Sequence, residues 1–148
     1  TSSLVGLGDV YKRQVQAGYL QLLSDLKKER DLSLMIISHD FGVINRISDK
    51  VVVMYAGSAM EYGDVKELWK EPKHPYTIGL LNSLPHIGNR RERLVSIPGS
   101  APIPGEITAG CPFAPRCDKA TEACRKETPK TIDGVHTFVR CLRYADKG

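Results

Sequence analysis

All four cysteines of this 148-residue chain come after Gly110, in its last quarter, at positions Cys111, Cys117, Cys124 and Cys141. Four thiols in one short stretch can form a four-ligand metal site, two disulfides, or buried core sulfurs. The N-terminus lacks a basic start followed by an apolar stretch, so we expect no export signal and a compartment that keeps thiols reduced. A reduced compartment disfavours the disulfides.

The spacing of the cysteines bears on which metal they would hold. Five, six and sixteen residues lie between successive cysteines, whereas structural zinc sites usually contain close C-x₂₋₄-C pairs. Wider spacing suits ligands that come from separate loops, as around a 4Fe–4S cluster held by four thiolates. The spacing predicts a metal site, and leaves zinc, an iron–sulfur cluster and buried free cysteines open.

The first half of the chain shows alternating helical and strand patterns. Apolar residues at three- and four-residue spacing predict an amphipathic helix that begins at Val15. The apolar run 32–37 predicts a strand buried on both faces, as in a parallel sheet. Asp40 is a suitable cap for a helix over 41–47.

The next segment carries turn and cap signals. The apolar runs 51–55 and 58–62, joined by Ala56-Gly57, predict a hairpin at a sheet edge. Asp64, followed three residues later by Glu67, predicts the start of a short helix. This order of helices and strands predicts an α/β fold.

The character of the chain changes at Pro85. Pro75 is well placed for the first turn of a last helix, but six of the nine prolines lie between Pro85 and Pro115. This composition predicts an irregular extension that leads into the cysteines.

The histidines differ in their surroundings. His39 directly follows the predicted buried strand, where ligands of open α/β sheets gather, so it can reach a substrate or phosphate. The alternative is a histidine that satisfies a loop carbonyl. His74, His86 and His136 are isolated in the sequence and are predicted at the surface rather than as ligands, although His136 lies close enough to Cys141 to be a reserve ligand.

Several function classes receive no support from the sequence. The chain has no G-x-x-x-x-G-K-[ST] motif and so cannot cradle a triphosphate by itself. No apolar run approaches the ~20 residues of a membrane-spanning helix. The net charge of +4 comes from interspersed acidic and basic residues, which does not argue for nucleic acid or a membrane surface.

Two sets of segments resemble a known family. The first resembles the switch-histidine segment and following strands of ABC transporter ATPase subunits: residues 35–43 (MIISHDFGV), 49–57 (DKVVVMYAG) and 61–63 (EYG). The second resembles the oligopeptide/dipeptide permease subgroup: residues 74–77 (HPYT), 97–99 (IPG) and 110–117 (GCPFAPRC). The resemblance extends from Val15 to the C-terminus.

The resemblance implies a fold and two sites. Residues 15–84 would be the C-terminal part of a P-loop (RecA-like) ABC ATPase domain, and residues 85–148 the subgroup's extension. His39 matches the switch histidine, which contacts the γ-phosphate of ATP bound with Mg. The four cysteines match those of the extension, which implies a 4Fe–4S cluster, with zinc as the alternative.

The resemblance also implies a cellular role. The intact subunit would hydrolyse ATP to drive peptide import at the cytoplasmic face of the membrane. Its partners would be a paralogous or identical ATPase subunit and two transmembrane permease subunits, without nucleic acid. The phosphate loop, signature motif and catalytic glutamate are absent from this chain, so the chain alone is expected to be inactive. Residues 1–14 resemble translated sequencing-adapter sequence and are expected to be non-native.

The sequence leaves two other functions open. One is a small zinc or iron–sulfur interaction module without ATPase ancestry, which could contact nucleic acid through its basic residues. Salt-dependent nucleic-acid binding would distinguish it. The other is a redox protein that uses the cluster. It ranks lower because the sequence offers no flavin or nicotinamide site.

Overall fold

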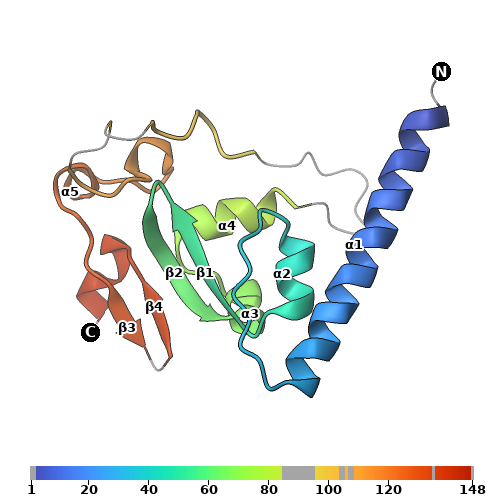
Figure 1. The fold of residues 1–148 in the computed structure, drawn as a ribbon. Helices are drawn as coiled ribbons and strands as arrows, with labels where there is room; N and C mark the ends of the chain where they lie inside the picture. Colours follow the sequence, from blue (N-terminus) through green and yellow to red (C-terminus); the bar gives the residue numbers. More distant parts are fainter. Residues whose placement is uncertain (1–2, 85–95, 104–105, 107–108, 135, 148) are drawn as a thin grey trace. The chain divides into compact units, whose positions relative to one another are not determined.

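The computed structural model describes residues 3–84, 96–103, 106, 109–134 and 136–147 (Figure 1). The chain divides into two compact units, Thr1–Asp49 and Lys50–Gly148, and each is described by itself. No helix among the described residues is both long and apolar enough to cross a membrane.

The first unit contains two helices, α1 (Ser3–Glu29) and α2 (Phe41–Ile47). The predicted start of the first helix at Val15 is wrong, because α1 already begins at Ser3. Residues 3–14 contain no proline, and extending an existing helix costs far less than nucleating one. The cap of α2 is confirmed: Asp40 Oδ1 accepts hydrogen bonds from the backbone of Gly42 (2.8 Å) and Val43 (3.3 Å).

The predicted buried strand over 32–37 is wrong. This segment has no regular structure, and the side chains of Met35 and Ile37 are 94% and 96% exposed. A parallel strand is stable only between neighbouring strands and under helices, and the sheet formed by the described residues begins at Lys50. The apolar run therefore has the composition of a buried strand without the partners that would bury it.

The second unit is built on a four-stranded antiparallel sheet with strand order β1-β2-β4-β3. The predicted hairpin is confirmed as β1 (Lys50–Tyr55) and β2 (Ser58–Asp64). Ala56 and Gly57 turn with positive φ values of 47° and 75°, as two-residue hairpin loops require. The expected parallel sheet is not found among the described strands, since every pairing is antiparallel.

The C-terminal residues add a second hairpin to this sheet. Strands β3 (Ile132–Gly134) and β4 (Thr137–Val139) pair with each other, and β4 pairs with β2. Each has three residues, which is too short to show an alternating pattern in the sequence. Through the pairing of β4 with β2, this hairpin adds two strands to the sheet beside β2.

The described part of the second unit also contains short helices. They are α3 (Val65–Lys70), α4 (Pro75–Asn82), the 3₁₀ turns η1 (Ala114–Arg116) and η2 (Leu142–Lys147), and α5 (Glu122–Lys126). The cap before α3 is confirmed, because Asp64 Oδ1 accepts from the Lys66 backbone at 2.9 Å. The predicted place of Pro75 in the first turn of α4 is also confirmed.

The core of the second unit joins the sheet to the cysteine segment. Its buried members are Tyr55, Met60, Cys111, Phe113, Ala114 and Cys124. The ring of Tyr55 meets those of Tyr76 and Phe113 edge-on, at centroid distances of 4.7 and 5.2 Å. The cysteine segment is therefore an integral part of this core.

Candidate functional site

The four cysteines converge on one small cavity. They come from both sides of η1, from α5 and from the turn after β4, and all four line a cavity of about 20 Å³. All four are free thiols, and all except Cys117 are buried. The fold thus gathers side chains that lie up to 30 positions apart in the sequence.

A close backbone contact brings Cys111 against α5. The Cys111 backbone N–H donates to the Cys124 carbonyl at 2.8 Å. Gly110 makes this approach possible: its φ is +78°, and a Cβ there would lie 2.6 Å from the carbonyl groups of Cys124 and Arg125. The Thr121 hydroxyl caps α5 and lies 3.3 Å from Cys124 Sγ.

Arg116 ties the cysteine segment to the loop before it. Its Nε donates to the Pro98 carbonyl at 2.7 Å, and its Nη2 to the Ile97 carbonyl at 3.1 Å. The third donor, Nη1, reaches Tyr55 Oη at 3.3 Å. One guanidinium therefore holds the irregular loop against β1 and next to Cys117.

The environment of the thiols favours their neutral form. Burial is the largest cause that raises the pKa of Cys111, Cys117 and Cys141, and negative charge on neighbouring cysteines raises each further. Because each thiolate disfavours the others, the site would ionise readily only with a cation to neutralise it.

The donor set fits a four-thiolate metal in its chemistry, since four soft sulfur ligands face one cavity. The arrangement is not closed around an ion. Within the described residues, no three His, Cys, Asp or Glu side chains form a group close enough to hold a metal. A cavity of about 20 Å³ also has room for a water rather than a cluster. Metal binding would require the cysteine loops to shift.

His74 lies in the wall of the same cavity, and its predicted place at the surface is wrong. It is 1% exposed, and its Nδ1 accepts a hydrogen bond from the Tyr76 backbone at 3.0 Å, which caps α4. Its ring packs at a tilt on Phe113, 5.9 Å between centroids. Burial lowers the pKa of His74 to about 4, so the ring is neutral at pH 7. The signal in the sequence was the proline that follows, since His74-Pro75 is a cap and a first helical turn.

The other histidines are placed differently. His136 is exposed, as predicted, and His86 lies outside the described residues.

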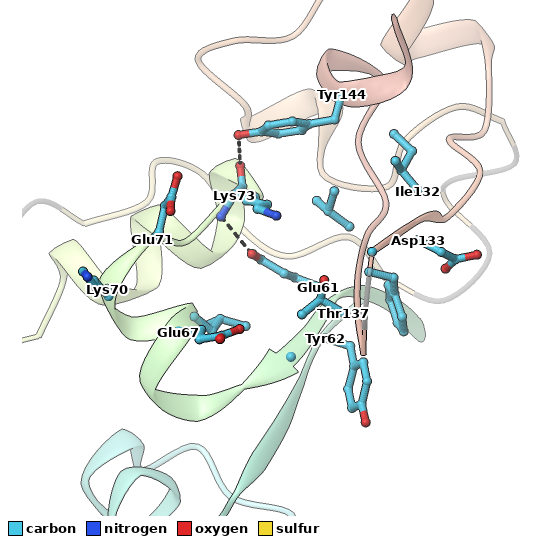
Figure 2. A pocket seen from close by; sticks show the side chains of 15 residues that line it. Glu61, Tyr62, Glu67, Lys70, Glu71, Lys73, Ile132, Asp133, Thr137 and Tyr144 are labelled. Carbon is cyan, nitrogen blue, oxygen red and sulfur yellow. Dashed lines mark hydrogen bonds between the residues drawn. The ribbon is translucent and has the colours of Figure 1, made fainter. Parts of the chain in front are cut away.

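A second, larger cavity is lined by the residues that hold the backbone next to His74. This groove has a volume of about 440 Å³ and lies between the sheet, the α3 segment and Tyr144 (Figure 2). Glu61, 4% exposed, accepts hydrogen bonds from the backbone of Lys73 (2.8 Å) and His74 (3.0 Å). Tyr144 donates to the Lys73 carbonyl at 3.2 Å. A buried carboxylate thus fixes the entry to α4.

His39 belongs to the first unit, whereas the cysteines belong to the second. It is exposed and sits between the apolar run 32–37 and the cap of α2. The Asp40 backbone donates to Ser38 Oγ at 3.0 Å, which shapes the turn that carries His39. Its contact with a phosphate stays a prediction.

Comparison with known proteins gives the family. Residues 60–124 match the family model described as "Oligopeptide/dipeptide transporter, C-terminal region", which includes three of the four cysteines. The chain is 46% identical over 134 residues to the oligopeptide transport ATP-binding protein OppD of Haemophilus influenzae, and 41% identical over 135 residues to AppD of Bacillus subtilis. Each alignment covers 90% of this chain and 41% of the relative.

A third relative, OppD of Salmonella typhimurium, is 44% identical over 115 residues, which are 78% of this chain and 34% of that protein. The chain thus spans about two fifths or less of the length of these curated relatives. Residues 60–124 thus belong to the oligopeptide/dipeptide transporter C-terminal region, and over 78–90% of its length the chain is similar to oligopeptide transport ATP-binding proteins.

Proposed function

We propose that this chain is the C-terminal part of the ATP-binding, ATP-hydrolysing subunit of an ABC transporter that imports peptides. The observation that carries the proposal is the match of residues 60–124 to the C-terminal region of the oligopeptide/dipeptide transporters. The relatives are described as oligopeptide transport and peptide import ATP-binding proteins. They offer no support for a separate metal-binding module without ATPase ancestry.

In the parent protein, the exposed run 32–37 would join a parallel sheet of the P-loop (RecA-like) domain. The support is physical: four of its six side chains are exposed apolar residues. Covering such a run with neighbouring strands and helices, as in a parallel sheet, removes this apolar surface from water. His39 would then lie at the carboxyl end of a buried strand. From there it would donate a hydrogen bond to the γ-phosphate of ATP bound with Mg as negative charge develops.

The partners follow from the proposed role. The subunit would pair with an identical or paralogous ATPase subunit and dock on two transmembrane permease subunits at the cytoplasmic face. The chain on its own carries no phosphate loop and should not turn over ATP.

The test uses the full-length subunit assembled with its permease subunits in liposomes. His39→Ala should lower ATP turnover roughly 100-fold or more, the loss expected when one transition-state donor is removed. His136→Ala, at an exposed histidine of the second unit, should leave turnover unchanged. Equal turnover of His39→Ala and the unmodified subunit would contradict the role of His39. ATP turnover by residues 1–148 that is lost in His39→Ala would contradict the expected inactivity.

We further propose that Cys111, Cys117, Cys124 and Cys141 bind one metal centre, a 4Fe–4S cluster or, as the alternative, zinc. The support is their convergence from four segments on one cavity, with all thiols free. Its role would be structural: metal ligation would fasten a proline-rich extension that has little secondary structure of its own. When bound, the metal would supply a cross-link among the four segments, and the cysteines of the chain would supply its thiolate ligands.

Anaerobic purification decides between the two metals. A brown protein with about four irons and four sulfides per chain would support the cluster. A colourless protein with one zinc per chain would select zinc. Metal content that persists when Cys124 is replaced by Ser would contradict the four-cysteine site.

A further inference from the structure

His39 is the middle residue of a short turn, and both of its neighbours use their side chains to accept backbone hydrogen bonds. Ser38 Oγ accepts from the Asp40 backbone N–H at 3.0 Å, so this bond spans His39. Asp40 Oδ1 in turn accepts from the backbone of Gly42 (2.8 Å) and Val43 (3.3 Å) in the first turn of α2. His39 therefore lies on a segment that two successive side-chain-to-backbone interactions connect to a helix.

The second of these interactions is anchored in the packed part of the first unit. Val43 is 8% exposed, so α2 is held by a buried side chain as well as by its ends. Gly42 leaves room for the cap, because a Cβ there would lie 3.1 Å from Asp40 Oδ1, closer than an ordinary van der Waals contact. The carboxylate of Asp40 thus has a defined place at the start of α2.

The hydrogen bond to Ser38 restricts the backbone of His39 itself. A serine hydroxyl that accepts from the N–H two residues later closes a small ring of atoms, and this ring includes both backbone dihedrals of His39. Without the bond, these dihedrals could change while Asp40 kept its cap, and the imidazole would then point elsewhere. His39 is exposed, so packing around its ring contributes little to its direction.

We propose that Ser38 is a positioning residue for His39: its hydroxyl holds the His39 backbone so that the ring keeps one direction. This inference rests on the contact of His39 with a phosphate in the proposed function. A donor stabilises developing charge best from a fixed position, and a small displacement lowers the rate without removing the donor. Ser38 acts through His39 and not on the phosphate.

The experiment measures ATP turnover by the full-length subunit assembled with its permease subunits in liposomes. Ser38→Ala removes the acceptor, and Ser38→Thr restores a hydroxyl at the same place. Ser48→Ala removes a hydroxyl at the other end of α2 and is the matched control. Ser38→Ala is also combined with His39→Ala, and thermal unfolding checks that every variant folds.

We expect Ser38→Ala to lower kcat about 2- to 10-fold, the effect of losing one neutral hydrogen bond, with the KM for ATP and the unfolding temperature unchanged. Ser38→Thr should recover most of kcat, and Ser48→Ala should match the unmodified subunit. When His39 is already alanine, Ser38→Ala should have no further effect, because the ring that Ser38 positions is gone. This non-additivity separates the positioning of His39 from a general structural role.

Three results would overturn the inference. If Ser38→Ala keeps the kcat of the unmodified subunit while His39→Ala loses turnover, the role of His39 stands and that of Ser38 is wrong. If Ser38→Ala lowers kcat by the same factor with and without the His39 ring, Ser38 acts independently of that ring. If His39→Ala itself keeps full turnover, the proposed contact of His39 and this inference fall together. Should Ser38→Ala not fold, Ser38→Cys, whose sulfur is a much weaker acceptor, decides by the same comparison.

Discussion

The apolar run 32–37 of the first unit and the hairpin of the second unit differ in how their apolar side chains are covered. In the first unit the run 32–37 exposes most of its apolar side chains, whereas in the second unit the strand residues Val53, Tyr55 and Met60 are buried. Both segments have the composition of strands. The difference shows that a strand sequence becomes a strand only with a partner. The antiparallel hairpin of the second unit carries its partner two residues away, and a parallel strand needs partners from elsewhere in the protein.

The largest expected effect is at Gly110, where the backbone lies close against the carbonyl groups of Cys124 and Arg125 in α5. Gly110→Ala should destabilise the second unit by more than about 3 kcal/mol, because φ is positive and the added Cβ would overlap two carbonyl groups. Urea unfolding followed by the fluorescence of Trp69 measures it, since this single tryptophan belongs to the second unit. Gly18→Ala in α1 is the matched control. A Cβ at Gly18 meets nothing within 4 Å, so that change should be neutral or stabilising by up to about 1 kcal/mol.

Acid should weaken the second unit through His74. Burial lowers the pKa of His74 from 6.5 to about 4, so the folded state resists a proton that the unfolded state accepts. The contribution of the buried neutral ring is complete above pH 6.5 and is lost as the pH falls from 6.5 to 4. It amounts to roughly 3 kcal/mol. Urea unfolding of the metal-free chain, followed by Trp69 fluorescence at several pH values, should show this loss of unfolding free energy, whereas His74→Asn should lack the contribution of the ring. If the unfolding free energies of the two proteins fall equally between pH 6.5 and 4, the burial of a neutral ring is contradicted.

The three guanidinium hydrogen bonds of Arg116 should contribute less to the unfolding free energy. Arg116→Lys keeps the charge, but its donors share one nitrogen and cannot reach the three acceptors that three guanidinium nitrogens contact, so the change should cost about 1–2 kcal/mol of unfolding free energy in the second unit. Arg125→Lys, at an exposed side chain of α5, should stay within about 0.5 kcal/mol. If both changes have the same effect, the guanidinium contacts do not hold the loop.

The smallest expected effect in this chain is in the exposed run 32–37. It tests most directly the difference between this run and the buried strands of the second unit. Ile37→Ser should change the unfolding free energy of this chain by less than about 0.5 kcal/mol, because the side chain is 96% exposed. The same change in the full-length subunit should cost about 2–4 kcal/mol if the run is a buried strand there. Thermal unfolding of both proteins with and without the substitution measures the difference. A small effect in both would contradict the proposed parallel strand.

Local signals predicted the elements that depend on near neighbours in sequence. Asp40 and Asp64 as caps, Ala56-Gly57 as a hairpin turn and Pro75 as a helix start each act over two or three residues. The helix boundary at Val15 failed because apolar periodicity reports packing, whereas a backbone helix can continue without it.

Features that depend on distant residues could not be read in this way. The pairing of β4 with β2 joins residues that are nearly 80 positions apart, through strands too short to show a period. His74 is buried by Phe113 and anchored by Glu61, and no local pattern around it indicates either contact. The cysteines were predicted as one site by their clustering, and the structure brings them to one cavity. The metal stays a prediction because spacing and geometry constrain ligands better than they identify an ion.

The central claim is that all four cysteines act as one metal site, including Cys141, which lies beyond the segment matched to the family. Mass spectrometry after brief alkylation, in urea that unfolds the metal-free chain, tests it directly. We predict that the metal-loaded chain keeps all four thiols unmodified under these conditions, and that removing the metal with a chelator makes all four react together. Modification of Cys141 at the same rate with and without the metal would contradict the claim.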